Sequence, residues 1–220
     1  MGGHGAHDAA GAVTPEALAR ALAGRPPREH PPYPGRRNDR RAGVLVPVVW
    51  EPEPVAILAL RSATLRRHAG EVCFPGGGPE PGDGDLWATA TREAREELGL
   101  RARRRLGRLA STPLFTSEWR LEPFVAEVEP GPLVPDGTEV TRALRLPLRA
   151  ALAQASIPAV PYQVGEERLL SPYFFPEGQL LFGGTAHVLY ELLEVAAPLL
   201  GLTLPPLVAA PLPGWEAPLT

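Results

Sequence analysis

The sequence contains no lysine, so all 22 of its basic side chains are arginines. This absence excludes catalysis through a lysine Schiff base or a free ammonium group. Any phosphate that the protein recognises must instead be held by guanidinium groups, which can donate two parallel hydrogen bonds to phosphate oxygens. A drift in genome composition explains the absence equally well, and its chemical consequence is the same.

Cysteine is almost absent as well. The single thiol, Cys73, cannot form an internal disulfide, which fits a reducing compartment. The N-terminus also lacks the basic and then apolar pattern of a signal peptide. We therefore expect a cytoplasmic protein.

The chain has no uninterrupted apolar run of membrane-spanning length. Residues 195–215 carry no charge and are long enough to span a bilayer. Five prolines break this segment, at positions 198, 205, 206, 211 and 213, and each removes a helix hydrogen bond that lipid could not replace. We expect no membrane association and interpret residues 196–220 as a Pro-rich apolar tail packed on the domain or on a partner subunit.

An excess of positive charge is lacking too. The net charge of −3 gives no overall attraction to nucleic acid or to an anionic membrane. With 220 residues, 44% hydrophobic and 21% charged, the chain is typical of a globular protein with one well-buried core. We expect a small-molecule partner and no nucleic acid, while the sequence leaves open whether the protein is a monomer or a homodimer.

The order of local patterns predicts an α/β fold. Thr14-Pro15-Glu16 is typical of a helix start and Gly24 of its end, and a Pro- and Arg-rich arm follows, so that residues 1–41 form an N-terminal segment. Strands are expected over 44–49, 55–60, 72–74, 106–111, 123–128, 140–146 and 179–182, and helices over 86–98, 147–154 and 185–195. This mixture predicts a mixed sheet between helical layers.

Three glutamates on the predicted helix over 86–98 are the first candidate site. Glu93 lies three residues before Glu96 and four before Glu97, so the three carboxylates can share one helix face. They repel one another, and only Arg92 and Arg95 offer local compensation. A divalent cation relieves the repulsion better, and Mg²⁺ or Mn²⁺ prefers carboxylate oxygens. The plainer alternative is a solvated helix face rich in Glu and Arg.

The loop before this helix favours the metal site over the solvated face. Residues 74–85 include three successive glycines, which let the backbone approach a ligand closely and direct N–H or C=O groups at it. A glycine loop alone is weak evidence of a site. A glycine loop followed at fixed spacing by a face of three carboxylates is strong evidence.

Residues 92–100 (REAREELGL) and the preceding loop resemble the signature of the Nudix hydrolase family. That signature is a glycine, five residues, an acid, seven residues and then Arg-Glu-apolar-x-Glu-Glu-x-Gly-apolar. The second half matches throughout. In the first half the acid position falls on Gly84, and counting from Gly77 gives five residues to Asp83 and then eight to Arg92. This indicates a one-residue insertion, which leaves the role of Asp83 open.

A second motif upstream resembles that of the coenzyme A pyrophosphatase branch of the family. It runs from Ile57 through Arg61, Arg66 and Gly70 to the Phe-Pro-Gly-Gly of residues 74–77, with Ala59 where a threonine is usual. That branch also commonly shows the one-residue loop insertion. The resemblance implies a Nudix-type α/β/α sandwich over residues 42–195, acting on the pyrophosphate bond of coenzyme A and its derivatives.

The resemblance also implies the roles of the site residues. Mg²⁺ or Mn²⁺ is expected on Glu93, Glu96, Glu97 and a backbone carbonyl of Gly76 or Gly77. The general base is expected to be Glu96 or Glu139, since Glu139 resembles by position a glutamate at the family's metal site. The resemblance thus implies Glu93, Glu96 and Glu139 as catalytic residues, and it implies that the substrate is bound by Arg61, Arg66, Phe74, Gly76 and Gly77.

Three alternatives stay open. Arg61 or Arg66 could pair with a carboxylate at the edge of the core instead of binding phosphate. The substrate could be another nucleoside diphosphate derivative, such as NADH or ADP-ribose. A more distant alternative is a non-catalytic nucleotide-sensing module on the same scaffold.

Overall fold

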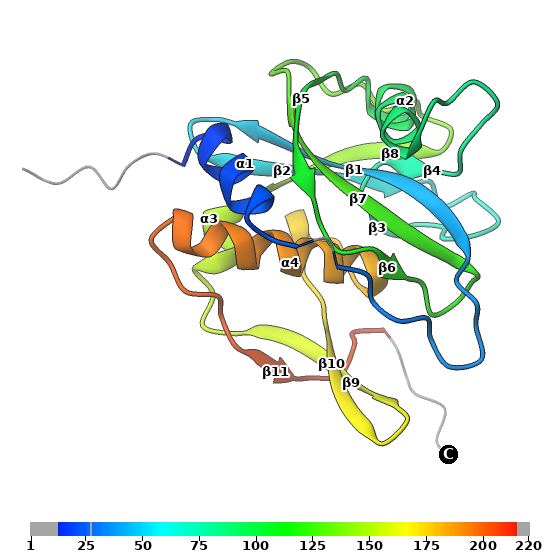
Figure 1. Ribbon diagram of the computed structural model, residues 1–220, viewed down its shortest axis with the longest axis vertical. Helices are drawn as coiled ribbons and strands as arrows, with labels where there is room; N and C mark the ends of the chain where they lie inside the picture. The colour runs from blue at the N-terminus through cyan, green and yellow to red at the C-terminus, as the bar shows by residue number, and fades with distance from the viewer. Residues whose placement is uncertain (1–12, 27, 215–220) are drawn as a thin grey trace, which may run out of the picture.

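A mixed β-sheet lies at the centre of the protein, as Figure 1 shows for the computed structural model, which describes residues 13–26 and 28–214. Its strands are β1 (Arg40–Trp50), β2 (Pro54–Arg61), β3 (Val72–Cys73), β4 (Gly76–Gly77), β5 (Ala102–Arg108), β6 (Thr112–Pro113), β7 (Trp119–Val128) and β8 (Val140–Pro147). The order along the sheet is β3-β2-β1-β7-β5, with β4 paired to β1, β6 to β7 and β8 to β2. Because β1 and β7 are parallel and the neighbouring pairs are antiparallel, the predicted mixed sheet is confirmed.

Helices cover both faces of this sheet. They are α1 (Pro15–Ala23), α2 (Leu86–Leu98), α3 (Leu148–Leu152) and α4 (Gly183–Leu199), with a short 3-10 turn, η1 (Pro176–Gly178). The buried side chains of α2 pack on one face, and those of α1, α3 and α4 pack on the other. The α/β/α sandwich expected from the sequence is therefore the fold observed.

Strand β1 shows why the central strands are continuous apolar runs. Its even-numbered residues Val44, Val46 and Val48 belong to the core shared with α4, whereas Leu45 and Val49 belong to the core under α2. Successive side chains of a strand point to opposite faces, so a strand covered on both faces must be apolar at every position.

The predicted helix boundaries follow from their caps. The Thr14 hydroxyl accepts a hydrogen bond from the Ala17 N–H at 3.2 Å, and the Asp85 carboxylate accepts one from the Ala88 N–H at 2.8 Å. At the end of α2, Gly99 adopts the left-handed conformation (φ 69°) that favours glycine. The sequence thus located both ends of α2, the helix that carries the three glutamates.

A second, smaller sheet was not predicted. It consists of β9 (Ile157–Val164), β10 (Glu167–Pro172) and β11 (Leu207–Ala209), in the order β10-β9-β11. Strand β11 belongs to the apolar tail and pairs in parallel with β9, while Leu202 and Leu204 pack against the core on the α4 side. Among the described residues, none of the helices is long and apolar enough to cross a membrane.

Three local predictions need correction. The strand expected over 179–182 is wrong. Leu181 forms only an isolated antiparallel bridge with Phe174, and neither residue belongs to a strand. The strand expected over 106–111 is instead β5, which ends at Arg108, followed by the separate β6. The helix expected over 185–195 is longer at both ends, because α4 runs from Gly183 to Leu199. Expectations for residues 1–12 and 215–220 lie outside the described part of the chain.

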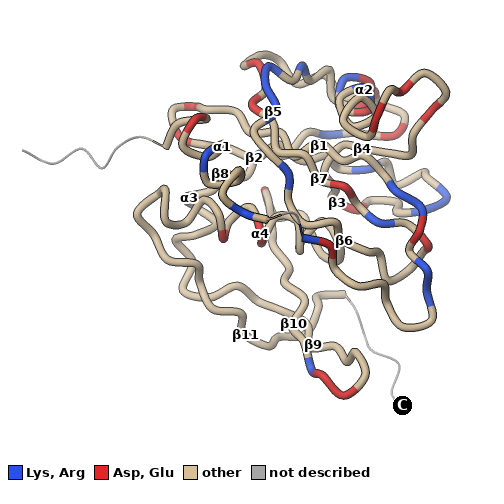
Figure 2. Tube along the Cα trace, in the orientation of Figure 1, with Lys and Arg blue, Asp and Glu red and all other residues tan. Residues whose placement is uncertain are grey.

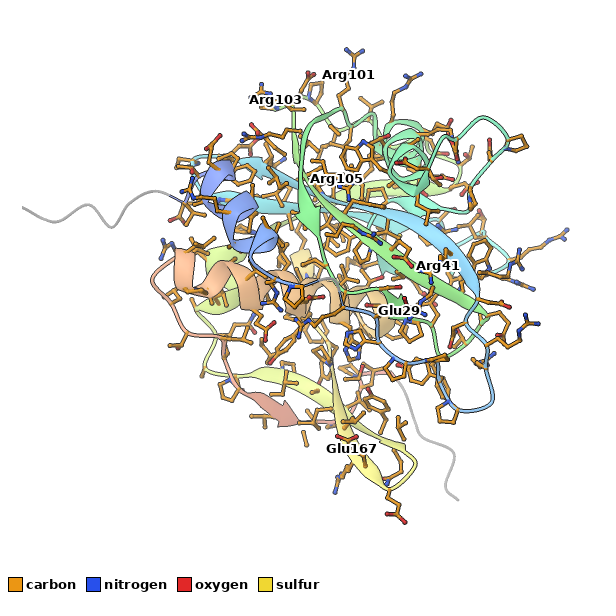
Figure 3. The ribbon with its side chains drawn as sticks, viewed as in Figure 1. Glu29, Arg41, Arg101, Arg103, Arg105 and Glu167 are labelled. Carbon is orange, nitrogen blue, oxygen red and sulfur yellow. The ribbon has the colours of Figure 1, made fainter. Side chains whose placement is uncertain are left out.

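The N-terminal arm between α1 and β1 is fixed to the body of the protein by charged contacts. Glu29 pairs with Arg120 and lies 3.3 Å from Arg41 at the start of β1 (Figure 3). Nearer α1, Arg25 and Arg28 contact Glu191 of α4. The arm therefore runs along the start of β7 and the side of α4.

Candidate active site

Helix α2 brings two of its glutamates against the glycine strand β4. Glu97 accepts a hydrogen bond from the backbone N–H of Gly76 at 3.3 Å. A side chain at Gly77 would overlap the carboxylate of Glu93. The absence of side chains on β4 therefore allows both carboxylates to approach its backbone.

Gly43 is a further requirement of this geometry, and the sequence analysis did not single it out. A Cβ atom there would overlap the Leu86 carbonyl and lie 3.1 Å from the Ala90 backbone nitrogen. Gly43 also pairs with Gly77 across β1 and β4. Glycine at this position lets the first turn of α2 lie directly on the sheet, which sets the height of the glutamates above β4.

Carboxylates surround a hollow beside α2 with a volume of about 210 Å³. It is lined by Glu93, Glu96, Glu97, Asp136, Thr138 and Glu139. In Figure 2 acidic positions gather on α2 and on the loop that precedes it. Glu139 therefore shares a site with the helix glutamates, although it is 42 positions after Glu97 in the chain.

Asp136 was missed by the sequence analysis, and it orders the loop that carries Glu139. Its carboxylate accepts hydrogen bonds from the backbone N–H groups of Thr138, Glu139 and Val140, at 3.1, 2.9 and 2.8 Å. Although burial raises the pKa of Asp136, these bonds and the Thr138 hydroxyl outweigh it and hold the pKa at about 2. The Asp-Gly-Thr sequence indicates a turn, and this was the signal available.

The two inner glutamates are held close together with little solvent. Glu97 is only 5% exposed, and burial, followed by the nearby charge of Glu93, raises its pKa to about 7. Burial also raises the pKa of Glu93, against the opposing effect of Arg92. Both shifts mark a place where negative charge is insufficiently compensated by the protein itself.

Arg61 partly compensates this charge. Its guanidinium lies 3.8 Å from Glu97 and 4.0 Å from Glu139, and its buried Nε atom has no hydrogen-bond partner among the described residues. Arg61 therefore pairs with carboxylates, as one of the alternatives from the sequence analysis expected. Both of these carboxylates line the hollow, so Arg61 lies beside it without being one of the lining residues.

Asp83 lies away from the hollow and binds Arg92 instead. Its two oxygens each lie 3.2 Å from a nitrogen of the Arg92 guanidinium, and it also accepts hydrogen bonds from the Thr89 hydroxyl and the Glu80 N–H, both at 2.9 Å. The hydrogen bond from Arg92, the largest contribution, lowers the pKa of Asp83 to about 2. Asp83 thus ties the inserted loop to α2.

The other three predicted site residues, Glu96, Phe74 and Arg66, lie in three different environments. Glu96 is turned toward Arg92, at 2.9 Å, and its side chain is 58% exposed at the mouth of the hollow. The Phe74 side chain is buried in the core on the α4 side, so the structure does not bring it to the site. Arg66 is exposed on the loop after β2 and forms no ion pair with a described residue.

The donor set suits a hard divalent cation. Within the described ranges, no three acidic, histidine or cysteine side chains already stand at metal-binding distances from one another. The residues nevertheless fit such an ion, because several carboxylates converge on one hollow and the two innermost repel each other. Mg²⁺ and Mn²⁺ prefer oxygen ligands of this kind.

Comparison with known proteins gives three findings. The model of the NUDIX domain matches residues 39–164. A protein of Photorhabdus laumondii named uncharacterized Nudix hydrolase NudL is 36% identical over 170 residues, covering 74% of this chain and 90% of that protein. Its namesake in Yersinia pestis is 36% identical over 164 residues, covering 71% and 80%.

Among solved structures, the chain is similar to the NUDIX domain of Shewanella oneidensis NrtR complexed with ADP ribose. The TM-score is 0.41 at 15% identity, covering 61% of this chain and 85% of that one.

Proposed function

The chain belongs to the NUDIX domain family and is a hydrolase of nucleoside diphosphate derivatives. We propose that its substrates are coenzyme A and the derivatives of coenzyme A. The products are 3′,5′-ADP and 4′-phosphopantetheine, or the acyl form of the latter. The observation that carries the proposal is the convergence of Glu93 and Glu97 on the glycine strand β4, beside a hollow lined by carboxylates.

Nudix hydrolases generally use divalent metals, and the proposed ligands here are Glu93, Glu96, Glu97 and a backbone carbonyl of Gly76 or Gly77. A bound Mg²⁺ or Mn²⁺ supplies positive charge that stabilises the charge developing on the phosphate oxygens and makes water more acidic. The protein contributes the position of the site. Glu97 is held by the Gly76 N–H, and the contacts of Arg92 with Glu93 and Glu96 restrict both side chains.

The general base is proposed to be Glu96 or Glu139. Both side chains line the hollow, and both are mostly exposed, at 58% and 61%, so water can reach them. The chosen carboxylate accepts a proton from the water that attacks phosphorus, and the pyrophosphate bond breaks in line with that attack. Asp136 holds the loop of Glu139, because its carboxylate accepts a hydrogen bond from the Glu139 N–H.

Two arginines are proposed to bind the phosphates of the substrate. Coenzyme A carries a pyrophosphate and a separate 3′-phosphate, so it needs cationic groups beyond the metal. Arg61 contacts Glu97 and Glu139, which line the hollow, and Arg66 is exposed on the adjoining loop without an ion pair among the described residues. Arginine suits both tasks because its planar group can bind phosphate through two hydrogen bonds.

Two alternatives are retained. The first is that the substrate is another nucleoside diphosphate derivative, such as NADH or ADP-ribose. The second and more distant one is that the chain is a nucleotide-sensing module without catalysis. The three glutamates on α2 argue against the second alternative, because binding alone does not need them.

Changing Glu97 to Gln tests the catalytic site. We expect coenzyme A hydrolysis with Mg²⁺ or Mn²⁺ to fall at least tenfold, which corresponds to about 1.4 kcal/mol of barrier, because an amide replaces an ionised oxygen ligand. Glu16→Gln, a change of the same chemistry on the surface of α1, serves as the control and should keep full activity. A smaller loss in the Glu97 variant argues against a ligand role.

A substrate panel tests the choice of coenzyme A. Rates with coenzyme A, dephospho-coenzyme A, NADH and ADP-ribose are compared for the wild type and for Arg66→Ala. If Arg66 binds the 3′-phosphate, the wild type prefers coenzyme A, and the variant loses that preference while keeping its rate on dephospho-coenzyme A. A wild type that hydrolyses NADH or ADP-ribose best is evidence for the first alternative.

A further inference from the structure

Trp119, at the start of β7, lies against the glycine loop on the side away from α2. A Cβ atom at Gly78 would stand 2.9 Å from the tip of the Trp119 ring, whereas one at Gly77 would meet Glu93. Successive positions of an extended chain face opposite sides. The glycine segment therefore separates the carboxylates on one face from an indole ring on the other.

The position of Trp119 is fixed by its backbone. Its carbonyl accepts hydrogen bonds from the Leu114 N–H at 2.9 Å and from the side-chain amide of Asn38 at 3.1 Å. Asn38 is 1% exposed, and its amide also donates to the carbonyls of Leu114 and Ser117. Its left-handed conformation (φ 45°), which asparagine tolerates better than most residues, directs the amide into this loop.

Arg40 completes an aromatic and cationic surface. Its guanidinium lies 4.3 Å from the centre of the Trp119 ring, and the two residues are partners across β1 and β7. The indole is half-buried and the arginine is exposed. In Figure 2 basic positions line the start of β1 and the arm before it, in contrast to the acidic positions of α2.

We propose that Trp119 and Arg40 form the platform on which the nucleobase of the substrate stacks, a proposal that rests on the proposed function. The pyrophosphate lies at the carboxylate hollow, and the substrate passes the edge of the glycine segment that separates Glu93 from Trp119. Every nucleobase has a flat π-face that an indole can stack on, and a guanidinium adds a cation to the stack. The platform therefore binds the nucleoside end and leaves the chemistry to α2.

A second pair of the same kind supplies a matched control. Arg105 of β5 lies 5.8 Å from the Trp87 ring, at the start of α2, and the position of Arg105 is visible in Figure 3. Trp87 packs edge-on against Phe124, in the core under α2, and it is not among the atoms nearest to a Cβ built at Gly76, Gly77 or Gly78. A Trp–Arg pair at this position has no access to a substrate that crosses β4.

The experiment measures the affinity of ADP and of inorganic pyrophosphate, each with Mg²⁺, by titration calorimetry. The proteins are the wild type, Trp119→Phe, Trp119→Leu and the control Trp87→Leu, with thermal unfolding as the check of folding. We expect Trp119→Leu to bind ADP about tenfold or more weakly, Trp119→Phe to lose less, and neither to change in pyrophosphate affinity. Trp87→Leu should bind ADP as the wild type does.

Each outcome bears on the proposal. Unchanged ADP affinity in Trp119→Leu overturns the platform, and so does an equal loss for ADP and pyrophosphate, which indicates a disturbed loop. Coenzyme A hydrolysis by the wild type separates the two proposals. An active wild type with an unaffected Trp119→Leu variant overturns the platform alone, whereas a wild type that neither hydrolyses nucleoside diphosphate derivatives nor binds ADP overturns both.

Discussion

At the scale of single residues, Asp83 has a structural role in the loop that contains the one-residue insertion. The carboxylate lies too far along the loop to line the hollow, but it holds Arg92 through both of its oxygens. Arg92 also contacts Glu93 at 3.1 Å and Glu96 at 2.9 Å. Asp83 therefore governs how strongly Arg92 competes with a cation for the two glutamates.

Replacing Asp83 by Asn should weaken metal binding. The neutral side chain can still accept the Glu80 N–H, but it no longer balances the charge of Arg92, which then pairs more strongly with Glu93 and Glu96. We expect the Mg²⁺ concentration for half-maximal activity to rise roughly tenfold, as for other partners of metal ligands. Asp39→Asn, which removes an exposed partner of Arg37, should leave it unchanged. An unaltered Mg²⁺ requirement in Asp83→Asn contradicts this role.

The glutamates of the site could be located from the sequence, whereas Asp136 could not. Spacing of four residues on a helix predicts that Glu93 and Glu97 share a face, and the structure has them both at β4. Glu96, on the same predicted face, also lines the hollow, but its side chain is mostly exposed and contacts Arg92. Asp136 depends on how its loop folds back onto Glu97, whose carbonyl accepts the Asp136 N–H at 3.0 Å, and no local pattern encodes that.

At the scale of elements, the sequence predicts best where local chemistry decides the structure. Helix α2 was delimited correctly because Asp85 caps its start and Gly99 ends it in a left-handed turn. The strands β1 and β2 were found because both are buried on two faces over residues 44–49 and 55–59 and are apolar there. These signals lie within about ten neighbouring residues, so they can be recognised without the tertiary fold.

The small sheet was not predicted because its central strand, β9, contains prolines, which are not typical of a strand. Pro158 and Pro161 lie in β9, where each lacks the N–H group that a ladder normally requires. Its partner β11 comes from the tail, some 50 positions later, and is only three residues long. The apolar tail was expected to pack somewhere, but only the fold reveals that residues 207–209 add a strand.

At the scale of the whole molecule, helix α4 connects the main sheet to the small one. Its buried side chains belong to the core of the main sheet, while His187 on the same helix lies 3.1 Å from the Ser171 hydroxyl of β10. Burial, followed by the charge of the nearby His30, lowers the pKa of His187 to about 4. The junction between the two sheets thus contains a histidine that is uncharged at neutral pH.

This histidine should make the stability of the fold sensitive to acid. In the unfolded chain His187 has its ordinary pKa of 6.5, so between pH 6.5 and about 4 the unfolded state binds more protons than the folded state. The stabilisation is fully present above pH 6.5 and is lost as the pH falls through 4, by about 3 kcal/mol at most.

Denaturant unfolding of the wild type and of His187→Gln at several pH values measures this loss of stability. We expect the wild type to lose more stability than the variant across this range, whereas His68→Gln, at an exposed histidine, should follow the wild type. A constant difference between wild type and His187→Gln from pH 7.5 to 4.5 contradicts the assignment, because a buried neutral histidine must then be absent from the junction.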